Sequence, residues 1–216
     1  MALLSIKVRR KPQQSRAKMT QAALVESFVR LLKEKPSADI TIREMTELAG
    51  VGLGTFYEYF SQKEDLIALT IHQYVKSNAK QLKQQAELWR TERDQKQLTL
   101  AQLKQLIKYL LRFQIRQIQA EQQIWAQLFL LERQISSPEA YQKHYQLMIY
   151  VWDQALNCYT HNPAQNLSLN IHRISYGFIS QSLLVNPDFQ HWDQLAQEII
   201  HLIFCLLPET EKIGMI

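Results

Sequence analysis

The fold of this chain is decided by residues 40–66, which have the sequence ITIREMTELAGVGLGTFYEYFSQKEDL. Thr41 and Glu44 are spaced as in a capping box, where each side chain bonds the other residue's backbone N–H at the start of a helix. We expect that helix to end at Gly50, because glycine readily adopts the positive φ that a tight turn between helices needs. A second short helix is expected over Leu53–Tyr59. The stretch therefore predicts two short helices joined by a tight turn.

Small residues mark the start of the second short helix. Gly52 and Gly54 would let a backbone come close to a bulky partner, and an aromatic cluster follows within residues 56–60. A helix N-terminus presents free N–H groups and the positive end of the helix dipole, which suit phosphate. Two short helices, the second with small residues at its exposed start, are the usual device for entering the major groove of DNA. We therefore predict a helix-turn-helix, with Phe56 and Phe60 as core residues.

Outside this stretch the sequence predicts helix nearly throughout, because no segment sustains a period-two alternation of apolar and polar residues. A first helix is expected over residues 15–35, and a second capping box, Ser61–Glu64, opens a long helix that ends near residue 89. The apolar face of the first helix is expected to hold Ala22, Val25, Val29 and Leu32, with Leu24 and Phe28 beside them. Further helices are expected over residues 98–118, 121–134, 138–159, 167–185 and 190–207.

Positive charge is concentrated at the N-terminus. Residues 1–20 carry six basic side chains and no acidic one, whereas the whole chain has a formal net charge of only +5. Such an arm could attract an anionic polymer or surface. A solvated tail is the alternative interpretation.

Residues 40–66 resemble the DNA-binding signature of the tetracycline-repressor (TetR/AcrR) family, and the resemblance extends over residues 15–70. The motifs in register are Ala49-Gly50-Val51, Gly54-Thr55, Tyr57, Tyr59-Phe60 and Lys63-Glu64-x-Leu66. The chain departs from the family at Gly52, where serine or threonine is usual, and at Met45-Thr46, where the family prefers isoleucine and alanine. We expect Gly52 to replace a side-chain phosphate contact by a backbone contact, and Thr46 to fit a crowded contact between helices.

The resemblance implies an all-α fold of about nine helices, with a three-helix DNA-binding domain ahead of a larger helical domain. The expected boundaries are a basic flexible arm over residues 1–14, the helix-turn-helix domain over residues 15–62 and an effector-binding and dimerisation domain over residues 63–216.

The resemblance also implies which residues contact DNA. The start of the second short helix would read base edges or thymine methyl groups, and the tyrosines and Lys63 would contact the DNA backbone. The supporting helix would contact phosphate through Thr41 and Arg43. The expected DNA-binding residues are Arg16, Thr41, Arg43, Gly52, Leu53, Gly54, Thr55, Tyr57, Tyr59 and Lys63.

The segment over residues 190–207 is apolar almost all round, so it needs a cover on a second face. Pairing of this helix and the preceding one with their copies would form a four-helix interface, which matches the family's usual homodimer and a palindromic operator. A helix central to one monomeric core is the alternative. The expected interface residues are Ile174, Phe178, Ile199, Ile203 and Leu206.

By the same resemblance, an effector pocket is expected among the middle helices and the long helix. Ligand pockets are largely apolar with a few placed polar groups, and we expect a lipophilic effector, with an anionic group as one option. An ordinary core role for the aromatic residues and a solvated position for the arginines are the alternatives. The pocket candidates are Asn78, Arg112, Phe113, Arg116, Trp125, Phe129, His144 and Trp152.

The predicted function is that of a ligand-responsive repressor of transcription, with an activator of the same fold as the alternative. An all-helical enzyme is less favoured, because the sequence has no phosphate-binding loop, no H-E-x-x-H motif and no nucleophile–base spacing. We predict no catalytic residue, metal or cofactor, since none of the six histidines pairs with another at an i, i+4 spacing. Redox sensing by Cys158 or Cys205 is not favoured either.

The composition favours a cytoplasmic protein that does not enter a membrane. No run approaches the roughly 18 apolar residues that a membrane-spanning helix needs. Two cysteines are too few for a disulfide framework. A protein that binds a membrane surface through its basic arm and an amphipathic helix is the remaining alternative.

Overall fold

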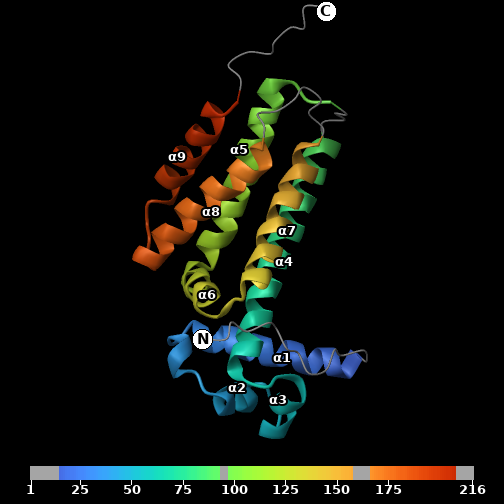
Figure 1. Ribbon diagram of the computed structural model, residues 1–216, viewed down its shortest axis with the longest axis vertical. Coiled ribbons are helices and arrows are strands. Elements are labelled where there is room, and N and C mark those ends of the chain that lie inside the picture. Colours follow the sequence, from blue (N-terminus) through green and yellow to red (C-terminus); the bar gives the residue numbers. More distant parts are fainter. Residues whose placement is uncertain (1–14, 93–96, 158–165, 208–216) are drawn as a thin grey trace, which may run out of the picture. The chain divides into compact units, whose positions relative to one another are not determined.

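The computed structural model describes residues 15–92, 97–157 and 166–207, which are helical almost throughout (Figure 1). The predicted all-α class is confirmed. No helix within these ranges is long and apolar enough to cross a membrane. The elements are α1 (Ser15–Leu32), the short 3-10 helix η1 (Ser37–Asp39), α2 (Ile42–Leu48), α3 (Leu53–Tyr59), α4 (Lys63–Thr91), α5 (Leu100–Ala120), α6 (Gln122–Ile135), α7 (Pro138–Leu156), α8 (Leu167–Val185) and α9 (Trp192–Cys205).

Side-chain caps fix where the helices begin. At α2 the Glu44 N–H donates to Thr41 Oγ1 at 3.2 Å and the Thr41 N–H donates to the Glu44 carboxylate at 2.8 Å, which confirms the predicted capping box. At α4 the predicted Ser61–Glu64 pair is wrong in its second member. The Ser61 N–H donates to the Asp65 carboxylate at 2.9 Å, one residue further along, because Asp65 is on the buried side of the helix.

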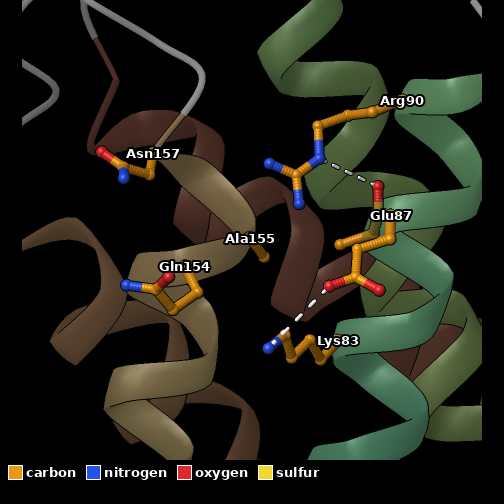
Figure 2. A pocket seen from close by; sticks show the side chains of 7 residues that line it. Lys83, Glu87, Arg90, Gln154, Ala155 and Asn157 are labelled. Carbon is orange, nitrogen blue, oxygen red and sulfur yellow. Dashed lines mark hydrogen bonds and ion pairs between the residues drawn. The ribbon is translucent and has the colours of Figure 1, made fainter.

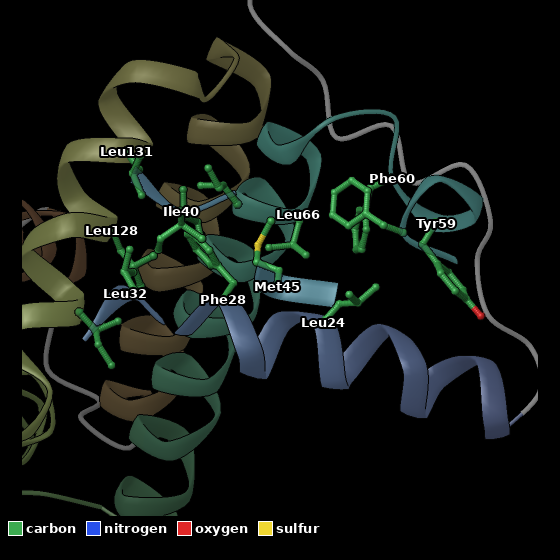
Figure 3. Packing of buried hydrophobic residues seen from close by; sticks show 14 residues of the cluster. Leu24, Phe28, Leu32, Ile40, Met45, Tyr59, Phe60, Leu66, Leu128 and Leu131 are labelled. Carbon is green, nitrogen blue, oxygen red and sulfur yellow. The ribbon is translucent and has the colours of Figure 1, made fainter. Parts of the chain in front are cut away.

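The chain divides into two compact units, and the first comprises residues 1–75 and 123–144. Its core brings α1, α2, α3 and the start of α4 together with α6 (Figure 3). The buried face of α1 is formed by Leu24, Phe28 and Leu32, which are all fully buried. The predicted face is confirmed except at one position: Val25 and Leu32 are buried and Val29 is half-buried, whereas Ala22 is exposed.

Helix α6 is an unexpected member of this core. It contributes Ile124, Leu128 and Leu131 to the same hydrophobic cluster as α1 and α2. The Gln127 side chain adds two hydrogen bonds: it accepts from the Ser37 N–H at 3.0 Å and donates to the Leu32 carbonyl at 2.7 Å. One residue of α6 thereby holds both ends of the connection between α1 and η1.

The second unit comprises residues 76–122 and 145–216, and its helix α9 packs against α5 and α8. Helix α5 is joined to α4 by a buried hydrogen bond from Gln114 Nε2 to Asn78 Oδ1 at 2.8 Å. Because the units divide α4 after Val75, the division by packing differs from the functional boundary expected at residues 62/63. That boundary stays a prediction.

Candidate nucleic-acid interface

A tight turn joins α2 to α3. Gly50 has a φ of +66°, and its N–H donates to the Glu47 carbonyl at 3.1 Å, while the Val51 N–H donates to the Thr46 carbonyl at 3.0 Å. This φ lies in the left-handed region that glycine enters without steric cost, which confirms the predicted role of Gly50. Gly52 then serves as the N-cap of α3 with extended backbone and without a side-chain cap.

The aromatic cluster anchors α3 on one side. Phe56 and Phe60 are fully buried with ring centroids 5.3 Å apart, as predicted for core residues. Thr46, the family departure, is buried as well, and its hydroxyl donates to the Arg43 carbonyl at 2.9 Å, so the crowded contact accepts it. The opposite side of α3 faces out, because Leu53 is 50% exposed and Tyr57 is 43% exposed.

The outward surface of α2 and α3 combines polar, apolar and small residues. Thr41 and Arg43 are exposed on α2, and Arg43 pairs with Glu47 at 3.2 Å while its side chain stays 83% exposed. A Cβ added at Gly54 would meet nothing within 4 Å, and at Gly52 it would meet only Thr55 Oγ1 at 4.0 Å. Packing within the chain therefore does not require glycine at either position. The outward side chains and the glycines together leave a surface that a bulky partner could approach closely.

Two of the expected DNA-binding residues make contacts within the chain, and a third has a side chain that the structure does not describe. The Tyr59 ring is buried, with 4% of the residue exposed, and its hydroxyl points away from the cluster (Figure 3). Lys63 Nζ donates to the carbonyls of Ser37 and Ile40 at 2.6 and 2.9 Å, so it already supports the loop before α2. Arg16 lies in the first turn of α1, and its side chain, like the basic arm of residues 1–14, is outside the described part of the chain.

The start of α2 is held by an ion pair that was not predicted from the sequence. The ammonium group of Lys35 bonds the Glu44 carboxylate, and with the Thr41 N–H and hydroxyl it lowers the pKa of Glu44 from 4.5 to about 2. The negative charge of Glu44 thus fixes Thr41, the N-cap of α2, which is expected to contact DNA.

The expected effector residues are divided between the two units. In the first unit, Trp125 and Phe129 are buried with ring centroids 5.4 Å apart. In the second unit, Asn78 and Trp152 are buried, Phe113 is half-buried, and Arg112 and Arg116 are exposed. Whether any of them binds an effector stays a prediction.

His144 has partners that sequence spacing could not reveal. Its Nδ1 lies 2.9 Å from Glu132 Oε1, and its Nε2 lies 3.3 Å from Nδ1 of His72, which is 72 residues away. Glu132 and His144 are buried, so this is a hydrogen-bonded polar chain inside the first unit. Among the described residues, no group of three His, Cys, Asp or Glu side chains is arranged to hold a metal ion.

The expected interface residues on α8 and α9 have different exposures. Ile199 and Ile203 are fully buried within the chain itself. Ile174 is half-buried, and Phe178 and Leu206 are exposed. Other apolar side chains are exposed beside them, at Val185 and Leu202. The surface that a second copy could cover is therefore formed by these outward residues rather than by the buried isoleucines.

Comparison with known proteins agrees with this architecture. Residues 24–69 match the family model of bacterial regulatory proteins of the tetR family. No curated protein matches the sequence. Solved structures that are similar in fold include three regulators, and each of these alignments covers at least 89% of this chain.

The first is a TetR transcriptional regulator from Rhodococcus sp. RHA1, with 16% identity, a TM-score of 0.58 and coverage of 90% of this chain and 99% of the other. The second is the fatty acid degradation regulator FadR from Bacillus halodurans, with 14% identity, a TM-score of 0.59 and coverage of 89% and 96%. The third is NalD from Pseudomonas aeruginosa, the secondary repressor of the MexAB-OprM multidrug efflux pump, with 16% identity, a TM-score of 0.56 and coverage of 91% and 99%. Residues 24–69, which include the helix-turn-helix, thus match the tetR family of bacterial regulatory proteins, and the described chain shares the fold of solved regulators of that kind.

Proposed function

We propose that the protein is a homodimeric transcriptional repressor that binds a palindromic operator through α2 and α3 and is released by a small effector. The observation that carries this proposal is the outward surface of α3. It combines an exposed leucine and an exposed tyrosine with glycines that the chain's own packing does not require.

In this proposal the first turn of α3 enters the major groove. The half-exposed Leu53 offers an apolar contact for a thymine methyl group, and Gly54 and Thr55 allow the helix to come close to the base edges. Thr41, Arg43 and Tyr57 contact phosphates and set the register. Lys63 has two of its three N–H donors bound to carbonyls, so its main role is to support the loop before α2.

The proposed dimer forms through α8 and α9. Exposed apolar side chains on both helices would be covered by the same surface of a second copy, as in a two-fold symmetric interface. Two copies related in this way present two α3 helices, and a palindromic operator supplies the two matching half-sites. NalD, one of the structurally similar proteins, is a repressor.

The effector is proposed to bind in the second unit. Trp152 Nε1 and Gln114 Oε1 are buried there without a hydrogen-bond partner in the described structure. Buried polar groups are nearly always hydrogen-bonded, so a donor and an acceptor left unpaired favour a polar partner. Release from DNA follows if the effector prefers a dimer whose two α3 helices are wrongly spaced, and it can weaken DNA binding only by that differential affinity.

Selection from a randomised duplex pool at about 150 mM salt tests the DNA-binding part of this proposal. We expect enrichment of one palindrome. The Gly54→Ala variant is the sharpest probe, because the added methyl group meets nothing within the protein and alanine favours helix. We expect its fold to be at least as stable as that of the natural protein and its operator affinity to fall about 10-fold or more.

A second variant and a control complete this experiment. Arg43→Ala should weaken operator binding, whereas Arg116→Ala, which removes an exposed arginine of α5, should leave the affinity unchanged. Binding without an enriched sequence, or full operator affinity of Gly54→Ala, would refute the proposed role of α3. A screen for small molecules that release the protein from the selected palindrome then tests the proposed effector separately.

A further inference from the structure

The second unit contains a hollow that the DNA-binding proposal does not use. It has a volume of about 340 Å³ and lies between the later part of α4 and the end of α7 (Figure 2). None of the effector residues expected from the sequence lines it. Its polar lining comes from Lys83, Glu87 and Arg90 of α4 and from Gln154 and Asn157 at the end of α7.

Two small side chains, one from α4 and one from α7, leave room for the hollow. Ala86 and Ala155 both line it, and both are buried. Alanine methyl groups leave space that a longer side chain on either helix would fill. The floor is therefore small and apolar, and the longer polar side chains surround it.

The polar side chains around the hollow have unused hydrogen-bonding groups. Arg90 Nε donates to the Ala86 carbonyl at 3.2 Å, which orients the guanidinium, and its two terminal nitrogens have no bond to any described residue. The side-chain amides of Gln154 and Asn157 likewise have no partner in the described part of the chain. Figure 2 shows Arg90 reaching from α4 toward Asn157 across the hollow.

The charges favour an anion. Lys83 and Arg90 are positive, and Glu87 is negative, so the lining carries one net positive charge. The Lys83–Glu87 pair is 3.9 Å long with both side chains more than half exposed, so it holds Lys83 only weakly. The two terminal nitrogens of a guanidinium match the two oxygens of a carboxylate or phosphate.

We propose that this hollow binds a small organic oxyanion, a carboxylate or a phosphate monoester that also carries hydroxyl groups. Arg90 holds the anionic group, and the amides of Gln154 and Asn157 bond the hydroxyl groups. The volume is at the small end of the range for ligand pockets, about 300–1,000 Å³, which limits the ligand to a few carbon atoms beside its anionic group. The site is independent of DNA binding and stands or falls without the proposed function.

Titration calorimetry on the full chain without DNA tests the site with three matched probes: glycerate, glycerol 1-phosphate and glycerol. We expect at least one of the two anions to bind with a Kd below about 1 mM, and glycerol to bind at least 10-fold more weakly. Binding of only one anion supports the proposal and identifies the oxyanion as a carboxylate or a phosphate. If neither anion binds better than glycerol, the proposal is overturned.

Two variants test whether the anion binds in this hollow. Arg90→Gln removes the charge from a partly exposed position, and Ala155→Met fills the hollow while keeping every polar group. We expect each to weaken anion binding at least 10-fold, with circular dichroism confirming that the variant is folded. Lys108→Gln, at an exposed lysine of α5 outside the hollow, should bind like the natural protein. Unchanged binding by folded Arg90→Gln would place the anion elsewhere and overturn the proposal, even if Ala155→Met does not fold.

Discussion

Glu44 connects the start of α2 to Lys35, which lies just after the end of α1. Its carboxylate bonds Lys35 and both the N–H and the hydroxyl of Thr41, and these contacts lower its pKa from 4.5 to about 2. A carboxyl group whose pKa is lower in the folded state stabilises the fold above its unfolded pKa. That contribution is complete above about pH 4.5 and is lost as the pH falls toward 2.

We therefore predict that Glu44→Gln lowers the free energy of unfolding at pH 7 and that its deficit relative to the natural protein shrinks as the pH falls from 4.5 toward 2. Urea unfolding at a series of pH values measures both quantities. Glu47→Gln, at an exposed glutamate of the same helix, is the matched control and should change stability much less. A Glu44→Gln deficit that stays constant down to pH 2 would contradict the assigned pKa.

Gly50 is predicted to be required for its backbone conformation alone. A Cβ at this position would meet nothing within 4 Å, yet its φ is +66°, where an L side chain is strained. We expect Gly50→Ala to lower the free energy of unfolding by about 1–2 kcal/mol. Gly177→Ala is the matched control in α8, where the space is equally open and φ is helical, and it should raise stability by about 0.5–1 kcal/mol. Urea unfolding at one protein concentration measures the free energy of unfolding of both variants. Equal changes in Gly50→Ala and Gly177→Ala would refute the role of the Gly50 φ angle.

Among the helices, α6 is the one whose role is least evident from its sequence. Gln127 closes the connection between α1 and η1 by bonding the Ser37 N–H and the Leu32 carbonyl. Ser37 and Leu32 are both buried, so these two backbone groups would be left without the partner that Gln127 supplies if its amide were removed. Each such loss costs about 1–3 kcal/mol.

Gln127→Leu is accordingly predicted to lower the free energy of unfolding by about 2–4 kcal/mol, because it keeps the side-chain bulk and removes both hydrogen bonds. Gln123→Leu, at an exposed glutamine of the same helix, should stay within about 0.5 kcal/mol of the natural protein. Hydrogen exchange at the Ser37 amide provides a local measurement, and its protection should fall in Gln127→Leu only. Unchanged protection would show that α6 does not hold this connection.

The sequence predicts the elements well because their signals are local. Capping residues at Thr41, the turn glycine at Gly50 and the proline at Pro138 each act within a few residues, and the helices begin where these residues are found. The edge of a buried face is harder to place: Leu24, Val25 and Phe28 of α1 are buried as expected, whereas Ala22 is exposed. Helical periodicity gives the centre of the face, and the small alanine side chain at its edge gains little from burial.

Contacts between distant elements could not be predicted from one sequence. Gln127 bonds Leu32 across 95 residues, and His144 lies beside His72 across 72 residues. Periodicity shows which residues share a face, but it carries no information on which helix covers that face. The same limit applies to Lys63, whose bonds to two carbonyls of the loop before α2 could not be foreseen, and its expected DNA contact stays a prediction.

At the scale of the whole molecule, the proposed homodimer would place two α3 helices on the two halves of a palindrome. The exposed apolar residues of α8 and α9, Val185 and Leu202 among them, are the surface that a second copy would cover. Burying a charge in such an interface is costly, so a glutamate there should separate the subunits. A single subunit contacts only one half-site, and its operator affinity should fall with the loss of the dimer.

We predict that Leu202→Glu and Val185→Glu each raise the dissociation constant of the dimer about 10- to 100-fold, as light scattering over a dilution series would show. Val185 is 83% exposed, so its substitution cannot disturb packing within the chain and serves as the safer variant if Leu202→Glu unfolds. Leu130→Glu, at a leucine of α6 that is 47% exposed, is the matched control and should leave the dimer intact. For each variant, binding of the selected palindrome should fall in proportion to the fraction of the protein that remains dimeric. If both α8–α9 variants stay dimeric while Leu130→Glu dissociates, the interface lies on the first unit and the arrangement of the two α3 helices must be derived from that surface instead.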